Sequence, residues 1–156
     1  VQLLLYATYA SGVTGATSAT GAMGATGAVA VLIALTLLQA GVGTQVRGAV
    51  DHALDSGIAR ELAIGTVGRL DFIHRDLAFV VLMAATVVTL WLLSKRSALV
   101  SWAFVVLALA GLQIAVGLYM AYGYLLPAAQ VAHLTLSSLL LGAETVLWLN
   151  SRSRTA

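Results

Sequence analysis

Hydrophobic positions fall into four long stretches that carry almost no charge and are separated by shorter polar segments. A bilayer core about 30 Å thick requires about 20 mainly apolar residues per helix, and each stretch is close to that length or longer. The third stretch also has room for a tilted helix and a short turn. The pattern predicts an all-α fold, a polytopic membrane four-helix bundle with spans at 28–46, 72–93, 97–126 and 128–150.

The first 27 residues allow two interpretations. Residues 1–10 are apolar, whereas 11–27 consist mostly of Gly, Thr and Ser. The segment 1–27 is either a polar-leaning extension or an additional transmembrane helix of small residues, whose glycines would allow close approach to a neighbouring helix. The absence of charge over residues 1–46 favours the helix. We therefore expect this N-terminal segment to precede a four-helix domain at 28–156.

The composition supports a membrane protein and narrows its chemistry. Of the 156 residues, 60% are hydrophobic and only 9% are charged, which is outside the usage of soluble domains. The lack of cysteine excludes disulfides, thiolate metal sites, iron–sulfur clusters and covalent CxxCH heme attachment. The eight basic and six acidic residues are too few and too scattered for a nucleic-acid surface. Any cofactor must be held by histidine or by packing.

Basic residues predict the orientation in the membrane. Lys95 and Arg96 follow one span, and Arg152 and Arg154 follow the last one, so all four fall on the same side of the bilayer. Because basic residues concentrate in cytoplasmic loops, this side is expected to be cytoplasmic. The polar segment 47–70 then faces outward. We expect a multi-pass protein of the cell membrane.

Two histidines lie within predicted spans. His74 is near the start of its helix, and His133 is about five residues into the last helix. Both helices run inward, so at 1.5 Å per residue the two side chains differ in depth by about 5 Å. Ionisable groups in a membrane are rare and usually mark a site, and histidine is a common axial ligand of heme iron. If their helices are parallel neighbours, the two histidines predict a bis-histidine heme site near the outer face. The alternative is that each histidine is only a polar residue that is hydrogen-bonded within the bundle.

Charged residues around His74 are candidates for further roles. Asp71 precedes His74 by three residues and shares its helix face. It could orient the imidazole, accept protons or act on a substrate, or it could be an acid favoured by the helix dipole. Arg75 and Arg47 lie at the outer interface, where they could pair with heme propionates or anchor the helices. His52, in the polar segment, is expected to be solvated.

Two further patterns concern the interior of the bundle. Glu144, one to two turns from the inner end of the last helix, could pair with Lys95 or Arg96, and we assign it no catalytic role. Gln39 and Gln113 each precede glycines in the similar segments QAGVG and QIAVG, so the two halves of the chain echo one another. Glycines there allow tight helix packing or close approach of a porphyrin, and packing is favoured.

Four segments together resemble the heme A synthase family of membrane oxidoreductases. They are LLQAGVGTQVRGAVD, LDFIHRDLA, LQIAVG and LPAAQVAHLTLSSLL, in the family's order and spacing, and they extend from about residue 29 to 150. Family members usually have eight helices in two similar halves, each with a histidine pair. One half holds heme b, and the other oxidises a methyl group of heme O, through hydroxylations, to the formyl group of heme A. The resemblance implies that His74 and His133 match one pair and that Asp71 replaces a glutamate thought to assist the oxidation.

The chain departs from the family pattern in three ways. It has half the usual length and one histidine pair, it lacks the cysteines that many members carry in an outer loop, and Asp71 is one methylene shorter than glutamate. A two-site enzyme would therefore require a homo-oligomer. We expect a heme A synthase-like oxidoreductase with heme b as cofactor, heme O and heme A as substrate and product, and an electron donor in the membrane or at its outer face. The alternatives are a bis-histidine heme b cytochrome that only transfers electrons and a scaffold without cofactor.

Overall fold

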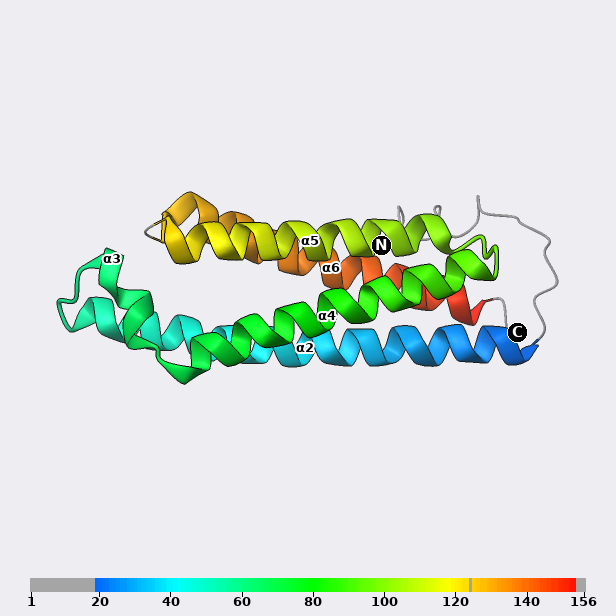
Figure 1. Ribbon diagram of the computed structural model, residues 1–156, viewed down its shortest axis with the longest axis horizontal. Coiled ribbons are helices and arrows are strands. Elements are labelled where there is room, and N and C mark those ends of the chain that lie inside the picture. Colours follow the sequence, from blue (N-terminus) through cyan, green and yellow to red (C-terminus); the bar gives the residue numbers. More distant parts are fainter. Residues whose placement is uncertain (1–18, 124, 154–156) are drawn as a thin grey trace.

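The computed structural model describes residues 19–123 and 125–153, which form a bundle of four long helices (Figure 1). A short helix, α3 (Arg60–Ala63), and a 3-10 turn, η1 (Ile64–Thr66), connect the first two of them, and no strand occurs in these residues. All four long helices have the length and composition of membrane spans. The predicted all-α four-helix membrane bundle is confirmed, with the helices α2 (Ala19–Asp55), α4 (Arg69–Ser94), α5 (Val100–Tyr122) and α6 (Pro127–Arg152).

The first long helix extends beyond the predicted span at both ends. Residues 19–27, expected in a separate N-terminal segment, belong to α2, and residues 1–18 lie outside the described residues. At the other end α2 continues to Asp55, where a charged loop was expected. An i,i+4 ion pair between Arg47 and Asp51 supports this extra part. The helix stops where Gly57 adopts a φ of +84° and the amide of Ile58 donates to the carbonyl of Ala53, an arrangement typical of a glycine C-cap.

The helices alternate in direction, and this alternation decides which of them are neighbours. Helices α2 and α5 each pack against both α4 and α6. The predicted parallel orientation of the two histidine-bearing helices, α4 and α6, is confirmed, but the prediction that they are neighbours is wrong. They face each other across the diagonal of the bundle, because short connections place consecutive helices side by side and antiparallel.

A tight apolar core fills only the half of the bundle nearer Arg152, which we call the Arg152 end. Many of its members are alanines, which allow helix backbones to approach closely in a membrane. Towards the opposite end, which carries α3 and is called the α3 end, α5 and α6 draw apart from α2 and α4 (Figure 1). The buried core residues are Ala25, Val29, Leu32, Val81, Ala85, Val88, Leu92, Leu99, Ala103, Val106, Ala110, Leu140, Ala143 and Leu147.

A second, smaller cluster closes the α3 end. Val50 and Ala53 of α2 pack with Ala63 of α3 and with Leu125, which lies in the connection between α5 and α6. The carbonyl of Leu125 also accepts a hydrogen bond of 2.7 Å from the Gln130 side chain. The connection from α2 to α4 therefore contacts the connection between α5 and α6, where Arg60 also donates to the Leu125 carbonyl.

The outside of the bundle is apolar along its length. Large hydrophobic side chains such as Leu38, Phe79, Met83 and Leu112 are half exposed or more. In water such a surface would drive aggregation, whereas lipid tails match it. The described helices thus suit a lipid bilayer.

Candidate cofactor site

His74 and His133 meet in the middle of the bundle. They lie five residues after the first residue of α4 (74 − 69) and six residues after that of α6 (133 − 127), so the predicted similarity in depth is confirmed. Their ring centroids are 6.5 Å apart, and the ring planes are inclined by 65°. Two residues that are 59 positions apart in sequence (133 − 74) thus face each other across the bundle diagonal.

Each imidazole lies against a glycine of the preceding long helix. A Cβ atom added to Gly43 of α2 would lie 2.9 Å from Cε1 of His74, and one added to Gly117 of α5 would lie 3.2 Å from Cε1 of His133. Both glycines are four residues after a glutamine, in the echoed segments of the sequence. Gly43 and Gly117 thus make room for a histidine ring, rather than for the close approach of two helices that was favoured from the sequence. Larger residues would push the rings out of position.

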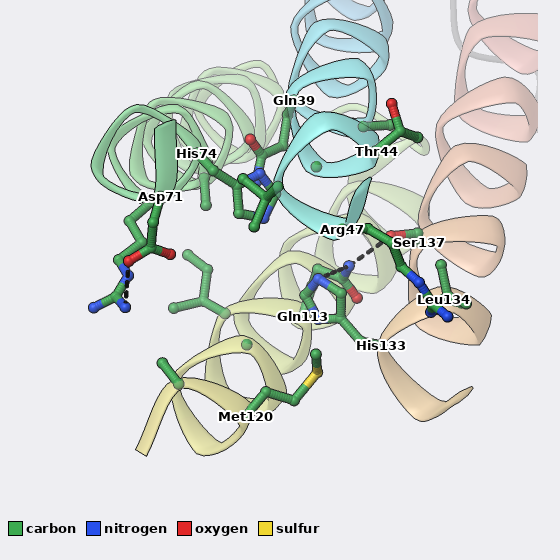
Figure 2. A pocket seen from close by; sticks show the side chains of 18 of the residues that line it. Gln39, Thr44, Arg47, Asp71, His74, Gln113, Met120, His133, Leu134 and Ser137 are labelled. Carbon is green, nitrogen blue, oxygen red and sulfur yellow. Dashed lines mark hydrogen bonds and ion pairs between the residues drawn. The ribbon is translucent and has the colours of Figure 1, made fainter. Parts of the chain in front are cut away.

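The histidines line a cavity of about 350 Å³ between all four long helices. This volume lies within the range of about 300–1,000 Å³ that is typical of small-molecule sites. Figure 2 shows His74 beside Gln39 and His133 beside Gln113. The cavity floor faces the apolar core and is formed by Thr36, Val81, Ala110, Leu140 and Leu141.

The two sides of the cavity differ in their hydrogen bonds. The amide nitrogen of Gln113 donates to Oγ of Ser137 at 2.6 Å and lies 3.2 Å from Nε2 of His133. Nδ1 of both histidines and Oε1 of both glutamines are buried and have no hydrogen-bond partner among the described residues. Buried polar atoms in folded proteins are generally satisfied. The backbones of Gln39 and Gln113 lie close enough to the imidazoles to supply part of what the Nδ1 atoms lack, so the glutamine oxygens are the atoms that most clearly lack a partner among the described residues.

The charged residues predicted for the site line the same cavity, but each is paired with a neighbour on its own helix. The carboxylate of Asp71 forms a 2.6 Å ion pair with Arg75 and makes no hydrogen bond to His74 in the described structure. The guanidinium of Arg75 also lies 5.9 Å from the ring centroid of Tyr122. Nε of Arg47 is 3.2 Å from Asp51, and both side chains are about half exposed. Asp71 is thus held by a cation and does not orient the imidazole.

Glu144 does not pair with Lys95 or Arg96, and that prediction is wrong. Its side chain is completely buried, and Oε1 accepts a 2.7 Å hydrogen bond from Oγ1 of Thr36 on α2. The physical reason is its rotation about the helix axis: Glu144 is 11 residues, about three turns, after His133 and shares its inward face. The two basic residues lie exposed in the connection between α4 and α5.

Other residues fit or extend the predicted site. His52 is exposed near the end of α2, which agrees with the predicted solvated role. Ser137 and Thr36 were not singled out from the sequence, although Ser137 follows His133 by one turn. The i,i+4 spacing could have identified Ser137. Thr36 could not be found in this way, because its role depends on contact with another helix.

The donor set fits an iron porphyrin better than a bare metal ion. No group of three or more His, Cys, Asp or Glu side chains that could hold a metal ion occurs in the described part of the chain. Zinc sites usually need three or four protein ligands, whereas heme iron needs only axial ligands. Two metal–nitrogen bonds of about 2 Å each, together with the ring radii, place imidazole centroids about 6 Å apart. The observed 6.5 Å is close to this separation.

Comparison with known proteins adds no assignment. No family model, curated protein or solved structure matches this chain. The functional interpretation of the site therefore depends on its residues, their geometry and the resemblance of the sequence motifs.

Proposed function

We propose that the protein is a heme-binding membrane protein in which His74 and His133 are the two axial ligands of one iron. The observation that carries this proposal is the pair of facing imidazoles, 6.5 Å between centroids, at a cavity between four apolar helices. When bound, heme b would supply one-electron redox chemistry. The guanidinium groups of Arg47 and Arg75, which line the cavity, would bind the propionate carboxylates.

We further propose that the activity is that of a heme A synthase-like oxidoreductase, which oxidises a methyl group of heme O to the formyl group of heme A. Hydroxylation of a methyl group by dioxygen would use two electrons from the donor and two protons and would form water, and a carboxyl group at the cavity could relay those protons. Asp71 lines the cavity and is mostly buried, with 13% of its side chain exposed, and Arg75 fixes its position. A two-site enzyme would need a second histidine pair, which another copy in a homo-oligomer would supply, and an electron donor.

A second candidate function is electron transfer by a bis-histidine heme b cytochrome, without heme modification. Two observations favour it. Two facing histidines would occupy both axial positions of the iron, which is typical of electron-transfer hemes rather than of sites that activate a substrate. The ion pair with Arg75 also neutralises the only carboxylate close to His74 that lines the cavity among the described residues.

The identity of the heme separates these functions. The protein is expressed in cells that make heme O and purified in detergent, and the extracted hemes are identified by chromatography and mass. Heme A or its hydroxylated precursor, present in the wild type and in the control Asp76→Ala but lost in Asp71→Ala, would support the synthase. The control residue Asp76 is exposed on the same helix. Heme b alone would support the cytochrome, and the absence of any heme would overturn both.

A further inference from the structure

A completely buried carboxyl group lies beyond the floor of the cavity. Glu144 is 0% exposed, and while its Oε1 accepts the hydrogen bond from Thr36, its Oε2 is buried without a partner among the described residues. The salt bridges found among the described residues pair Arg47 with Asp51 and Arg75 with Asp71, and neither includes Glu144. Ionisable side chains inside a membrane are costly and commonly take part in proton transfer. Glu144 is therefore a functional candidate that the heme site does not use.

Glu144 also stands apart in the charge pattern of the bundle. From one turn beyond the histidines to Arg152, the described parts of all four long helices contain no other Asp, Glu, Lys, Arg or His; Arg75 and Asp76 lie next to His74, at the level of the cavity. The ionisable groups nearest along the chain are His133 and Arg152 on its own helix. On the neighbouring helices, α5 has none of these residue types, and those of α2 begin at Arg47, 11 residues or about 16 Å beyond Thr36. The charges at the cavity are therefore the ones that can change the protonation of Glu144.

A column of polar side chains connects Glu144 with the histidines. On α6, His133, Ser137 and Glu144 follow one another at intervals of four and seven residues, which places them on one face. On α2, Thr36 and Gln39 form the matching face, and Thr36 both lines the cavity and holds the Glu144 carboxyl. The unpartnered buried side-chain atoms found in the described residues all belong to this column: Gln39 Oε1, His74 Nδ1, Gln113 Oε1, His133 Nδ1 and Glu144 Oε2.

We propose that Glu144 is a proton-exchange site that serves the histidine cavity from its floor. The carboxylic acid transfers one proton from Oε2 to a water molecule of the column, giving a carboxylate and hydronium, and the reverse step restores the acid. No electron and no other bond change is involved. Oε2 carries the proton because Oε1 is the acceptor for Thr36. Positive charge placed between His74 and His133 favours proton release, and removal of that charge favours uptake.

The first test uses infrared spectroscopy of the full chain in detergent without any cofactor, so its outcome does not depend on heme binding. A protonated carboxyl gives a carbonyl band that shifts when the hydroxyl hydrogen is exchanged for deuterium. We expect such a band at neutral pH in the wild type and in Glu61→Gln, whose residue is exposed on α3, but not in Glu144→Gln. A wild type without the band, or a band that survives in Glu144→Gln, would overturn the proposal.

A second, independent test of whether the band belongs to Glu144 uses its hydrogen bond with Thr36. Thr36→Val removes the donor to Oε1 and is expected to move the band to higher frequency. Thr89→Val is the matched control, because Thr89 is equally buried but its hydroxyl bonds to backbone carbonyls of Ala85 and Ala103. An unmoved band in Thr36→Val would contradict the role of Thr36 as the link.

The route through the cavity is tested by two adjacent serines. Ser137 lines the cavity and bonds to Gln113, whereas Ser138 is exposed on the lipid side and bonds to the backbone of its own helix. Ser137→Leu should slow deuterium exchange of the Glu144 band severalfold, and Ser138→Leu should leave the rate unchanged. Equal rates in the two variants would exclude the column as the route.

The response to charge at the histidines rests on the proposed function and is measured last. Hemin is added, and infrared difference spectra are recorded between the oxidised and reduced protein. Reduction should increase the Glu144 band in the wild type, and Glu144→Gln should lack this feature. Failure of hemin to bind would overturn the heme proposal and leave the proton site to be judged by the first three measurements. A bound heme whose reduction leaves the band unchanged would overturn the coupling.

Discussion

The two ends of the bundle are built from the same four helices but are filled in opposite ways. At the Arg152 end, alanine, valine and leucine side chains pack directly on one another. At the α3 end, the same helices present histidine, glutamine and glycine to a cavity, and several buried polar atoms have no partner within the described chain. The first end is filled by its own side chains, with the Glu144 carboxyl as its buried polar exception, whereas the second end leaves a cavity with room for a bound molecule. The comparison separates a half that is closely packed from a half that contains a cavity.

Removing a cavity histidine should give the largest effect, a loss of bound heme that distinguishes the α3 end from the packed end. We expect His74→Ala and His133→Ala each to lower heme content more than about 100-fold, beyond the 10- to 100-fold loss typical of residues that only support a ligand. The absorption spectrum of purified protein gives the heme content. His52→Ala, an exposed histidine, should behave as the wild type. Bis-imidazole spectra in both cavity variants would refute the site.

Truncating a side chain of the apolar core should lower the free energy of unfolding without changing the residues of the cavity. Leu147 is completely buried, and Leu149 on the same helix is 45% exposed. We expect Leu147→Ala to lower the free energy of unfolding by about 2 kcal/mol or more, because it leaves a cavity. Leu149→Ala should change it by less than about 0.5 kcal/mol. Unfolding in mixed micelles, followed by loss of helicity, measures both, and equal changes would contradict the role of Leu147 in the packed core.

The glycine under His74 is expected to matter next. The added Cβ of Gly43→Ala would lie 2.9 Å from the ring, so the imidazole must move. Overpacking of this kind costs about 1–3 kcal/mol, which corresponds to roughly tenfold or more in heme affinity. Gly41→Ala is the control, because its Cβ would meet nothing within 4 Å. Heme titration of the two variants should separate them, and similar affinities would show that the ring is not held in this position.

The glycine under His133 should give a smaller effect of the same kind. Its added Cβ would lie 3.2 Å from the ring, a contact that a shift of a few tenths of an ångström relieves. We expect the loss of heme affinity in Gly117→Ala to be severalfold and weaker than that in Gly43→Ala. Gly111→Ala, with open space around its Cβ, is the control. A reversed order of the two losses would mean that the His133 side is the more rigid one.

The smallest expected effect on folding belongs to the exposed ion pair at the α3 end. Arg47 and Asp51 are about half exposed, and such pairs contribute about 0–1 kcal/mol. Arg47→Ala should therefore leave the free energy of unfolding almost unchanged while weakening heme binding by a few fold if the arginine binds a propionate. An equal loss in Asp51→Ala would indicate that the ion pair, rather than the guanidinium, matters.

The sequence predicted the parts of this molecule that depend on one helix at a time. The four spans follow from apolar length, and the similar depth of His74 and His133 follows from helix direction and rise. The inward orientation of Glu144 was missed although it depends on α6 alone, because Glu144 lies about three turns after His133 on the same face; only its hydrogen bond with Thr36 depends on a second helix. The extension of α2 was missed because charges suggested a loop, although Arg47 and Asp51 are spaced to pair on a helix. The contacts of Gly43 and Gly117 with the rings depend on the relative positions of two helices, which periodicity does not contain.

The contact between a histidine ring and a glycine of the preceding long helix occurs twice along the chain. The hairpin of α2 and α4 supplies Gln39, Gly43 and His74, and the hairpin of α5 and α6 supplies their counterparts Gln113, Gly117 and His133. A single hairpin of this kind has one imidazole and can approach a planar ligand from one side only. The two-sided arrangement of imidazoles arises only where the two hairpins meet.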